Sequence, residues 1–492
     1  MGKDIGKQIG KATAWSSVTE IMAKLISPIV NLVLARVLAP EAFGVVATIT
    51  MVISFAELFT DAGFQKYIVQ HEFEDEDALN RSTNVAFWTN LSFSALICLI
   101  IIFFKDPIAS LVGSPGLGNS ISIASVLIIV AAFSSIQMAR YKRDFDFKTL
   151  FFVRIGTSFI PLVVTIPLAL WLRNYWALLI GTFVSNLFNA VVLTARSKWK
   201  PKFYYSFSLL KEMFAFSAWT LLESIAIWLT SYIGIFIVGN VLNDYYLGIY
   251  KTAMATINAY MAIITSAITP VLFSALSRYQ NDEKLFQDTY YRFQRLTAVF
   301  VLPMGVGIYL FSDLVTQILL GDQWMEASGF IGIWGLTSAL MIVFSNFASE
   351  VYRSRGNPKL SLFAQVLHLA FVVPVLMICV NYSFETLYTA RALVRLQGVL
   401  AALIIMQFVY RFSMIKVVRN VLPMAISAVL MGITGYFLQM VSVGFGWQLL
   451  SILICVLVYF AILLGFFPRT RTELLGFVKP LFGKIKNKLY QK

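Results

Sequence analysis

The sequence predicts an all-α polytopic membrane protein with about fourteen transmembrane helices. Of its 492 residues, 59% are hydrophobic and only 13% are charged, and the mean hydropathy is +0.77. A soluble domain of this length would need more charged residues on its surface. The apolar residues are gathered in stretches of ~20 or more, which is the length that one helix needs to cross a bilayer. Each of these stretches therefore predicts one crossing.

The first crossing follows a basic N-terminal segment, residues 1–12, in which Lys3, Lys7 and Lys11 share one helical face. This pattern is typical of a helix that lies on the membrane surface. The loops between crossings are short, so the working parts of the protein are expected within the membrane. The predicted crossings are 15–38, 42–65, 83–104, 119–138, 150–172, 175–195, 213–239, 245–275, 291–311, 325–347, 360–381, 385–410, 420–440 and 446–467.

The basic residues predict the orientation of the chain. Lys and Arg collect in alternate loops, whereas the loops on the opposite side hold only Lys105 and Arg173. Because basic loops stay on the cytoplasmic side, both termini are expected there. The basic tail, residues 469–492, interleaves Lys with apolar side chains, which suits contact with anionic membrane lipids. The net charge of +14 is spread over many small groups and so does not indicate a nucleic-acid partner.

A repeat becomes visible when the chain is aligned with itself at an offset of 204 residues. Trp15 then falls on Trp219, and Gly44 falls on Gly248. Six crossings per copy is an even number, so the two copies enter the membrane in the same orientation. We therefore expect two parallel six-helix lobes, residues 13–200 and 201–415, followed by two additional helices within residues 416–468.

Two tracts of the repeat resemble a known family. The residues LARVLAPEAFGVVATITMVISFAELFTDAGFQKYIVQ (34–70) closely resemble the signature of bacterial polysaccharide-exporting flippases, the Wzx-type branch of the multidrug/oligosaccharidyl-lipid/polysaccharide exporter superfamily. The tract LLKEMFAFSAWTLLESIAIWL (209–229) is similar to the start of the family's second half. The similarity extends through the twelve repeated crossings. It implies two lobes like those of multidrug exporters (MATE/MOP-like) in the bacterial cytoplasmic (inner) membrane.

The resemblance also implies a substrate. Members of this family move a polyprenyl-pyrophosphate-linked oligosaccharide from the cytoplasmic to the outer leaflet by alternating access, for O-antigen, capsule or exopolysaccharide synthesis. A hydrated anionic head group would need a wet, cationic cavity. The polar and basic side chains that lie within crossings, and that we expect to line such a cavity and bind the substrate, are Lys24, Asn31, Lys251, Arg391 and Arg395.

Four acidic residues also lie within crossings. Glu20 is four residues before Lys24, and Glu57 is four residues before Asp61, so each pair shares a helical face. Glu223 lies one position from the repeat equivalent of Glu20. These carboxylates either balance nearby cations or couple transport to sodium or protons. The sequence predicts no cofactor and no metal site, because Cys98, Cys379 and Cys455 are isolated within apolar segments.

Two other functions compete with the flippase. A cation-coupled multidrug or metabolite exporter of the same superfamily would favour an acidic cavity, whereas the charges within crossings include four cations. A membrane glycosyltransferase or polysaccharide polymerase would need a large external loop with paired carboxylates, which this sequence lacks. We therefore expect a transporter and not an enzyme. Polysaccharide polymerase machinery is a second expected partner beside the lipid-linked oligosaccharide.

Overall fold

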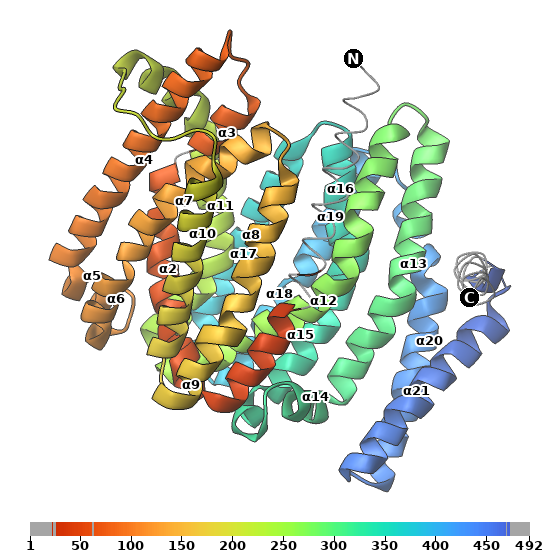
Figure 1. Cartoon of the computed structure of the whole chain (residues 1–492). Coiled ribbons are helices and arrows are strands. Elements are labelled where there is room, and N and C mark those ends of the chain that lie inside the picture. The colour runs from red at the N-terminus through yellow and green to blue at the C-terminus, as the bar shows by residue number, and fades with distance from the viewer. Residues whose placement is uncertain (1–21, 23–25, 62, 469, 473–492) are drawn as a thin grey trace, which may run out of the picture. The chain divides into compact units, whose positions relative to one another are not determined.

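The computed structural model describes residues 22, 26–61, 63–468 and 470–472, and every regular element in these residues is helical (Figure 1). Twelve of the described helical segments are long and apolar enough to cross a membrane, and α12 (Asp244–Arg278) adds another if its two parts count as one span. Twelve of the predicted crossings from 42–65 to 446–467 are thereby confirmed as apolar helices of sufficient length, and the remaining one, 245–275, corresponds to the bent helix α12. Of the first predicted crossing, 15–38, the structure describes an apolar helix at Ile26–Val37. The predicted surface helix, residues 1–12, lies outside the described residues, as does the basic tail apart from residues 470–472.

The helices up to α12 follow from alternating apolar and polar segments of the chain. Two of them begin at an aspartate that caps the helix: Asp75 accepts a hydrogen bond from the backbone of Ala78, and Asp146 accepts one from Thr149. The elements are α2 (Pro40–Asp61), α3 (Phe64–Gln70), α4 (Glu76–Phe103), α5 (Lys105–Leu111), η1 (Pro115–Leu117), α6 (Gly118–Ala124), α7 (Val126–Arg143), α8 (Phe147–Ile160), η2 (Pro161–Thr165), α9 (Ile166–Leu172), α10 (Trp176–Arg196), α11 (Phe207–Val241) and α12.

The later helices likewise correspond to apolar segments of the chain, and two of them also begin at a capping side chain. Asp282 caps one helix by accepting from the backbone of Leu285, and Ser413 caps another by accepting from Lys416. The elements are α13 (Glu283–Leu310), α14 (Ser312–Leu319), η3 (Asp322–Ala327), α15 (Ser328–Met341), η4 (Ile342–Asn346), α16 (Phe347–Ser354), α17 (Pro358–Cys379), α18 (Phe384–Val394), α19 (Leu396–Phe408), α20 (Met414–Val441) and α21 (Phe445–Phe466).

The described chain forms two compact units. The first contains the residues up to Ala259 together with Gln365–Leu387, and the second contains Tyr260–Ala364 and the residues from Tyr388 onward. Each unit has its own apolar core. The core of the first unit includes the fully buried side chains of Phe64, Ile136 and Met213. The core of the second unit includes those of Tyr290 and Phe412. The lobe boundaries at 13–200 and 201–415 come from the sequence repeat and stay a prediction.

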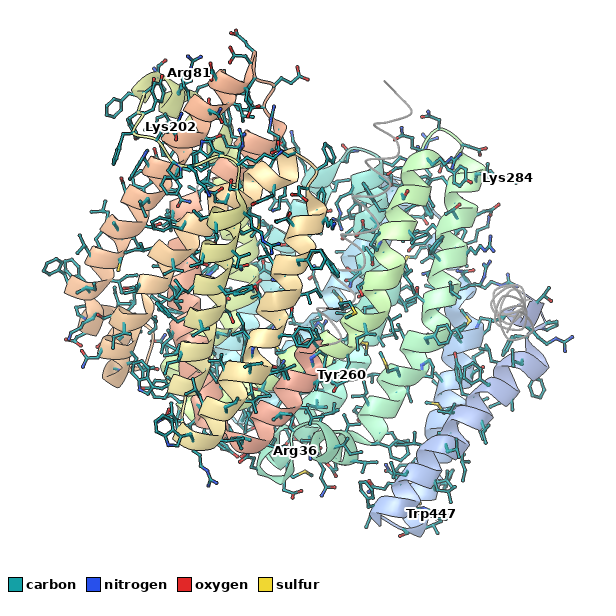
Figure 2. The ribbon with its side chains drawn as sticks, viewed as in Figure 1. Arg36, Arg81, Lys202, Tyr260, Lys284 and Trp447 are labelled. Atoms are coloured by element: carbon teal, nitrogen blue, oxygen red, sulfur yellow. The ribbon has the colours of Figure 1, made fainter. Side chains whose placement is uncertain are left out.

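A linker crosses the surface of the first unit between α10 and α11. The backbone of Lys202 donates to Oδ1 of Asn84 at 2.8 Å, and its carbonyl accepts from Nε1 of Trp88 at 2.9 Å. Phe203 stacks on the same indole, with ring centroids 4.7 Å apart. Figure 2 shows Lys202 and Arg81 at the same end of this unit. These contacts fix the start of α11 relative to α4.

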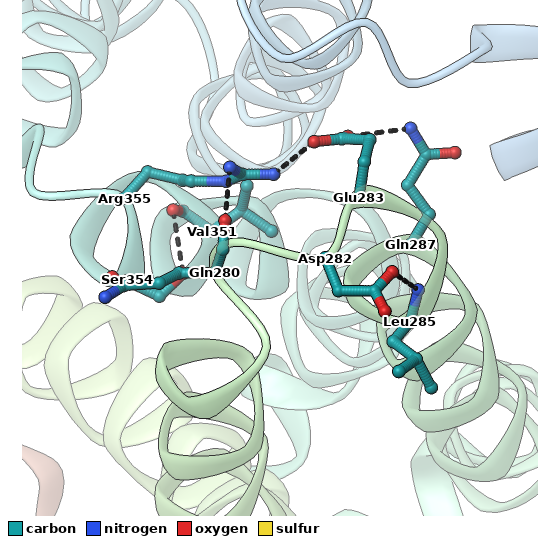
Figure 3. A network of polar contacts seen from close by, with 8 residues as sticks. All are labelled: Gln280, Asp282, Glu283, Leu285, Gln287, Val351, Ser354 and Arg355. Atoms are coloured by element: carbon teal, nitrogen blue, oxygen red, sulfur yellow. Dashed lines mark hydrogen bonds and ion pairs between the residues drawn. The ribbon is translucent and has the colours of Figure 1, made fainter.

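In the second unit, Arg355 joins the turn before α13 to the end of α16. Its guanidinium donates to the carbonyl of Gln280 at 2.6 Å and pairs with the carboxylate of Glu283 (Figure 3). The same group lies 4.2 Å from the ring centre of Phe286. Because the guanidinium has both a charged partner and an aromatic surface, the pair is more than an exposed ion pair and helps to hold this end of the unit together.

Two glycines that the repeat relates to each other touch within the first unit. A Cβ atom on Gly44 of α2 would lie 1.9 Å from the carbonyl oxygen of Asp244, and a Cβ on Gly248 of α12 would lie 1.8 Å from that of Pro40. Pro40 and Asp244 are themselves 204 residues apart. The contact is therefore reciprocal, as expected for two copies related by a twofold axis.

We predict that Gly44→Ala and Gly248→Ala each lower the unfolding temperature of the purified protein. The new methyl group would overlap a backbone oxygen, which cannot move without shifting its helix, at a cost of about 1–3 kcal/mol. The unfolding temperature is measured in detergent by heating the protein while its tryptophan fluorescence is recorded. Gly307→Ala on α13 is the control, because a Cβ there meets nothing within 4 Å. Unfolding of Gly44→Ala at the wild-type temperature would show that the contact constrains nothing.

Candidate functional site

A polar cavity of about 420 Å³ lies within the first unit. Six helices line it: α2, α3, α4, α7, α10 and α11. Glu57 contributes a carboxylate, Lys66 an amine, and the remaining polar groups are mostly amides and hydroxyls. Its volume falls within the ~300–1,000 Å³ typical of small-molecule sites. Since most of its lining helices are otherwise apolar, this concentration of polar groups marks the cavity as a candidate binding site.

The carboxylate of Glu57 is the charged group that helix α2 brings to the cavity. Its side chain is half-buried, and among the described residues it has neither an ion pair nor a side-chain hydrogen bond. One turn further along α2, the hydroxyl of Thr60 donates to the backbone carbonyl of Glu57 at 3.0 Å. Ser54 borders the same cavity and accepts a hydrogen bond from Trp228 of α11 at 3.0 Å. Glu57 therefore borders a polar cavity, and the role expected for it from the sequence, charge balance or ion coupling, stays a prediction.

Amides complete the cavity, and Asn90 of α4 is the most buried of them, at 1% exposure. Its Oδ1 accepts from Ser94 at 3.4 Å, and its Nδ2 has no hydrogen-bond partner among the described residues. Asn186 of α10 donates from Nδ2 to the carbonyl of Thr182 at 3.0 Å. Gln65 of α3 donates from Nε2 to Ser135 of α7 at 3.0 Å. The protein therefore holds each of these three amides by one end.

Two predicted substrate-binding arginines meet on one indole in the second unit. The guanidinium of Arg395 lies 3.8 Å from the ring centre of Trp334, and that of Arg391 lies 5.4 Å from it. Arg395 also donates to the hydroxyls of Ser338, at 2.9 Å, and Thr337, at 3.3 Å. It occupies the single-residue break between α18 and α19. The indole thus lies beside both cations, which are four residues apart, and Arg395 has the two hydroxyls as additional partners.

The remaining predicted substrate-binding residues are dispersed. Lys251 of α12 is partly buried in the first unit, and its amine lies 5.2 Å from the ring centre of Tyr232 on α11. Asn31 is exposed on the helix Ile26–Val37. Neither residue lines the polar cavity of the first unit. A substrate-binding role for both stays a prediction.

Four predicted residues cannot be placed in the same way. Lys24 and Glu20 lie outside the described residues. The structure describes Asp61 and Glu223 only through their backbones, in α2 and α11 respectively. The pairings expected from the sequence, Glu20 with Lys24 and Glu57 with Asp61, therefore stay predictions.

The sequence reasoning missed the amides that line the cavity and the indole that carries the arginines. A single Asn in an apolar helix does not stand out as a charge does, although several within one lobe would have been a usable signal. Trp334 is 61 residues from Arg395 in sequence, and only the packing of α15 against α19 brings the two together. No local spacing indicates that contact.

The chain is similar to several known proteins. A family model described as "Polysaccharide biosynthesis protein" matches residues 33–329. The succinoglycan biosynthesis transport protein ExoT of Rhizobium meliloti (strain 1021) is 24% identical over 341 residues, which are 69% of this chain and 68% of that protein. The teichuronic acid biosynthesis protein TuaB of Bacillus subtilis (strain 168) is 20% identical over 480 residues, 96% of this chain and 98% of that protein.

A solved structure, the lipid II flippase MurJ in an inward closed conformation, has the same fold. Its TM-score is 0.75 at 15% identity, and the match covers 93% of this chain and 99% of that one. A likeness at this identity establishes architecture, and it confirms the predicted many-helix exporter fold. The family model spans well over half of the chain, so the protein belongs to the polysaccharide biosynthesis protein family.

Proposed function

We propose that the protein is a flippase that moves a polyprenyl-pyrophosphate-linked oligosaccharide from the cytoplasmic to the outer leaflet by alternating access. The observation that carries this proposal is the pair of arginines on Trp334. A guanidinium offers two parallel N–H groups that match a phosphate, and two guanidiniums suit a pyrophosphate. Charges within apolar helices are costly, so a pair kept there indicates a function.

The comparisons support the same class of substrate. The relatives carry names that refer to succinoglycan transport and teichuronic acid biosynthesis, and the structural neighbour is named as a lipid II flippase. A transporter without covalent chemistry fits these names and the family. The export of O-antigen, capsule or another exopolysaccharide would each be compatible with this role. A cation-coupled multidrug or metabolite exporter is the second candidate, and the unpaired Glu57 carboxylate is the observation among the described residues that favours it.

The orientation and partners are part of the proposal. We place the protein in the bacterial inner membrane with both termini cytoplasmic, because the basic residues collect in alternate loops. Polysaccharide polymerase machinery would receive the translocated substrate on the outer side. Coupling to sodium or protons would operate through Glu57, or through Glu20, Asp61 and Glu223.

We predict that Arg391→Ala and Arg395→Ala each lower polysaccharide export at least about tenfold in a strain that depends on this protein. Each change removes charge-assisted hydrogen bonds worth roughly 1.5–3 kcal/mol to a phosphate. Surface polysaccharide is measured by immunoblot, and membrane levels of the protein by an epitope tag. Arg395→Lys should recover only part of the export, because an ammonium cannot bind in a bidentate manner. The control is Arg81→Ala, an exposed cation near the start of α4. Wild-type export in both alanine variants would exclude the arginines from the substrate site.

We also predict that Trp334→Leu lowers export while the protein still reaches the membrane. Leucine fills part of the space but removes the π face that both arginines share, a loss of about 0.5–2 kcal/mol for each contact. The arginines would then adopt other rotamers, and substrate affinity would fall. The matched control is Trp171→Leu, since Trp171 is 79% exposed at the end of α9. Equal export by both variants would contradict a positioning role for Trp334.

A further inference from the structure

The amides of the polar cavity in the first unit are fixed in a definite pattern. Because Nδ2 of Asn186 is engaged by a backbone carbonyl, its Oδ1 remains as an acceptor. Gln65 is held through Nε2 and likewise keeps an acceptor, Oε1. Asn90 is held through Oδ1, and its Nδ2 remains as a buried donor. The cavity thus combines fixed acceptors with a fixed donor, before any ligand enters.

This mixture selects the chemical class of the ligand. A bare cation binds best where every neighbouring group is an acceptor, so the buried Nδ2 of Asn90 would oppose it. A phosphate would be attracted by the amine of Lys66 but repelled by the carboxylate of Glu57, and the free acceptor atoms of Asn186 and Gln65 have no hydrogen to donate to it. A sugar hydroxyl both donates and accepts, and a sugar ring carries several hydroxyls in fixed directions. A sugar therefore matches this mixture of donors, acceptors and charged groups better than a bare cation or a phosphate does.

The carboxylate of Glu57 strengthens the match. Among the described residues its oxygens have no partner, and an ionised carboxylate can accept from two neighbouring hydroxyls. The hydroxyl of Ser134 also borders the cavity, and because it donates to the carbonyl of Ala131 it remains as an acceptor, whereas that of Ser224 can serve either role. A buried donor that lacks a partner is costly in an empty protein, and a ligand oxygen would relieve that cost.

We propose that this cavity is a saccharide subsite that holds one uncharged sugar residue of the transported head group. The proposal rests on the proposed flippase function for the origin of the sugar. The hydrogen bonds come from Asn90 as donor and from Asn186, Gln65 and Glu57 as acceptors. All the residues of this cavity belong to the first unit, whereas the arginine pair belongs to the second.

The test measures binding of free sugars to the purified full chain in lipid nanodiscs. Saturation-transfer NMR is recorded with glucose, galactose, N-acetylglucosamine and glucuronic acid as probes. We expect at least one of the three neutral sugars to bind, and glucuronic acid to bind more weakly because its carboxylate meets that of Glu57. Asn90→Leu and Asn186→Leu should each weaken binding about tenfold, as expected for the loss of one buried hydrogen bond.

A matched control separates a binding role from a structural one. Asn240 of α11 is exposed and donates from Nδ2 to the carbonyl of Phe236 at 3.0 Å, the same bond that Asn186 makes with Thr182. Asn240→Leu should leave sugar binding unchanged. Asn90→Leu removes an unpaired buried donor and also the long 3.4 Å hydrogen bond from Ser94, so the two effects should nearly cancel and the unfolding temperature should change little, whereas loss of a structural amide would lower it clearly.

The outcomes distinguish the two proposals. Absence of binding by any neutral sugar, or unchanged binding in both cavity variants, overturns the saccharide subsite. A sodium site would also overturn it. In that case sodium chloride would raise the unfolding temperature of the wild-type protein more than choline chloride does, Asn186→Leu would abolish this difference, and no sugar would bind. Export in cells is measured separately: if wild-type protein fails to restore polysaccharide export while the cavity still binds sugars, the flippase function fails and the subsite stands.

Discussion

The reciprocal contact between Gly44 and Gly248 is the constraint on which the first unit depends. Each glycine lies against the carbonyl that precedes the other by four residues, so two helix backbones approach without any side chain between them. In a membrane, where lipid is as apolar as leucine, close backbone packing of this kind is a main source of helix association. The contact also joins α2 to α12, and so ties the start of one repeat to the start of the other.

The glycine contact involves equivalent residues of both repeats, whereas the carboxylate of Glu57 has no equivalent in the second repeat. Glu57 aligns with Met261 at the same offset that relates the two glycines, and Met261 is 3% exposed. The carboxylate therefore belongs to the first repeat alone, although the cavity that it borders also takes Leu221 and Ser224 from α11, in the second repeat. An internal duplication supplies two similar bundles, and later substitution can give each a different task. A cargo with a charged pyrophosphate and a neutral sugar chain is itself asymmetric, so two unlike sites suit it better than two copies of one.

Hydropathy predicted most of the fold because lipid imposes one strong rule, that every backbone group be paired within an apolar helix. The crossing predicted at 446–467 is a helix at Phe445–Phe466, and that at 360–381 is Pro358–Cys379. The site was harder to predict. Glu57 could be predicted as a site residue because a carboxylate is costly in hydrocarbon, whereas Asn90 and Trp334 are ordinary members of apolar helices. Their importance depends on which helices are neighbours, and neither local spacing nor composition contains that information.

Neutral amides give a transporter an advantage that charges do not. An amide held at one end has lost its freedom before the ligand arrives, so little entropy is lost on binding. Each hydrogen bond to a sugar is still worth only about 1 kcal/mol, because water competes for the same groups. Asn90, Asn186 and Gln65 together would therefore give weak and selective binding. A flippase must release what it binds, and a tight site would slow release on the far side. Selectivity from several modest, fixed contacts is compatible with turnover, whereas affinity from a few strong ones is not.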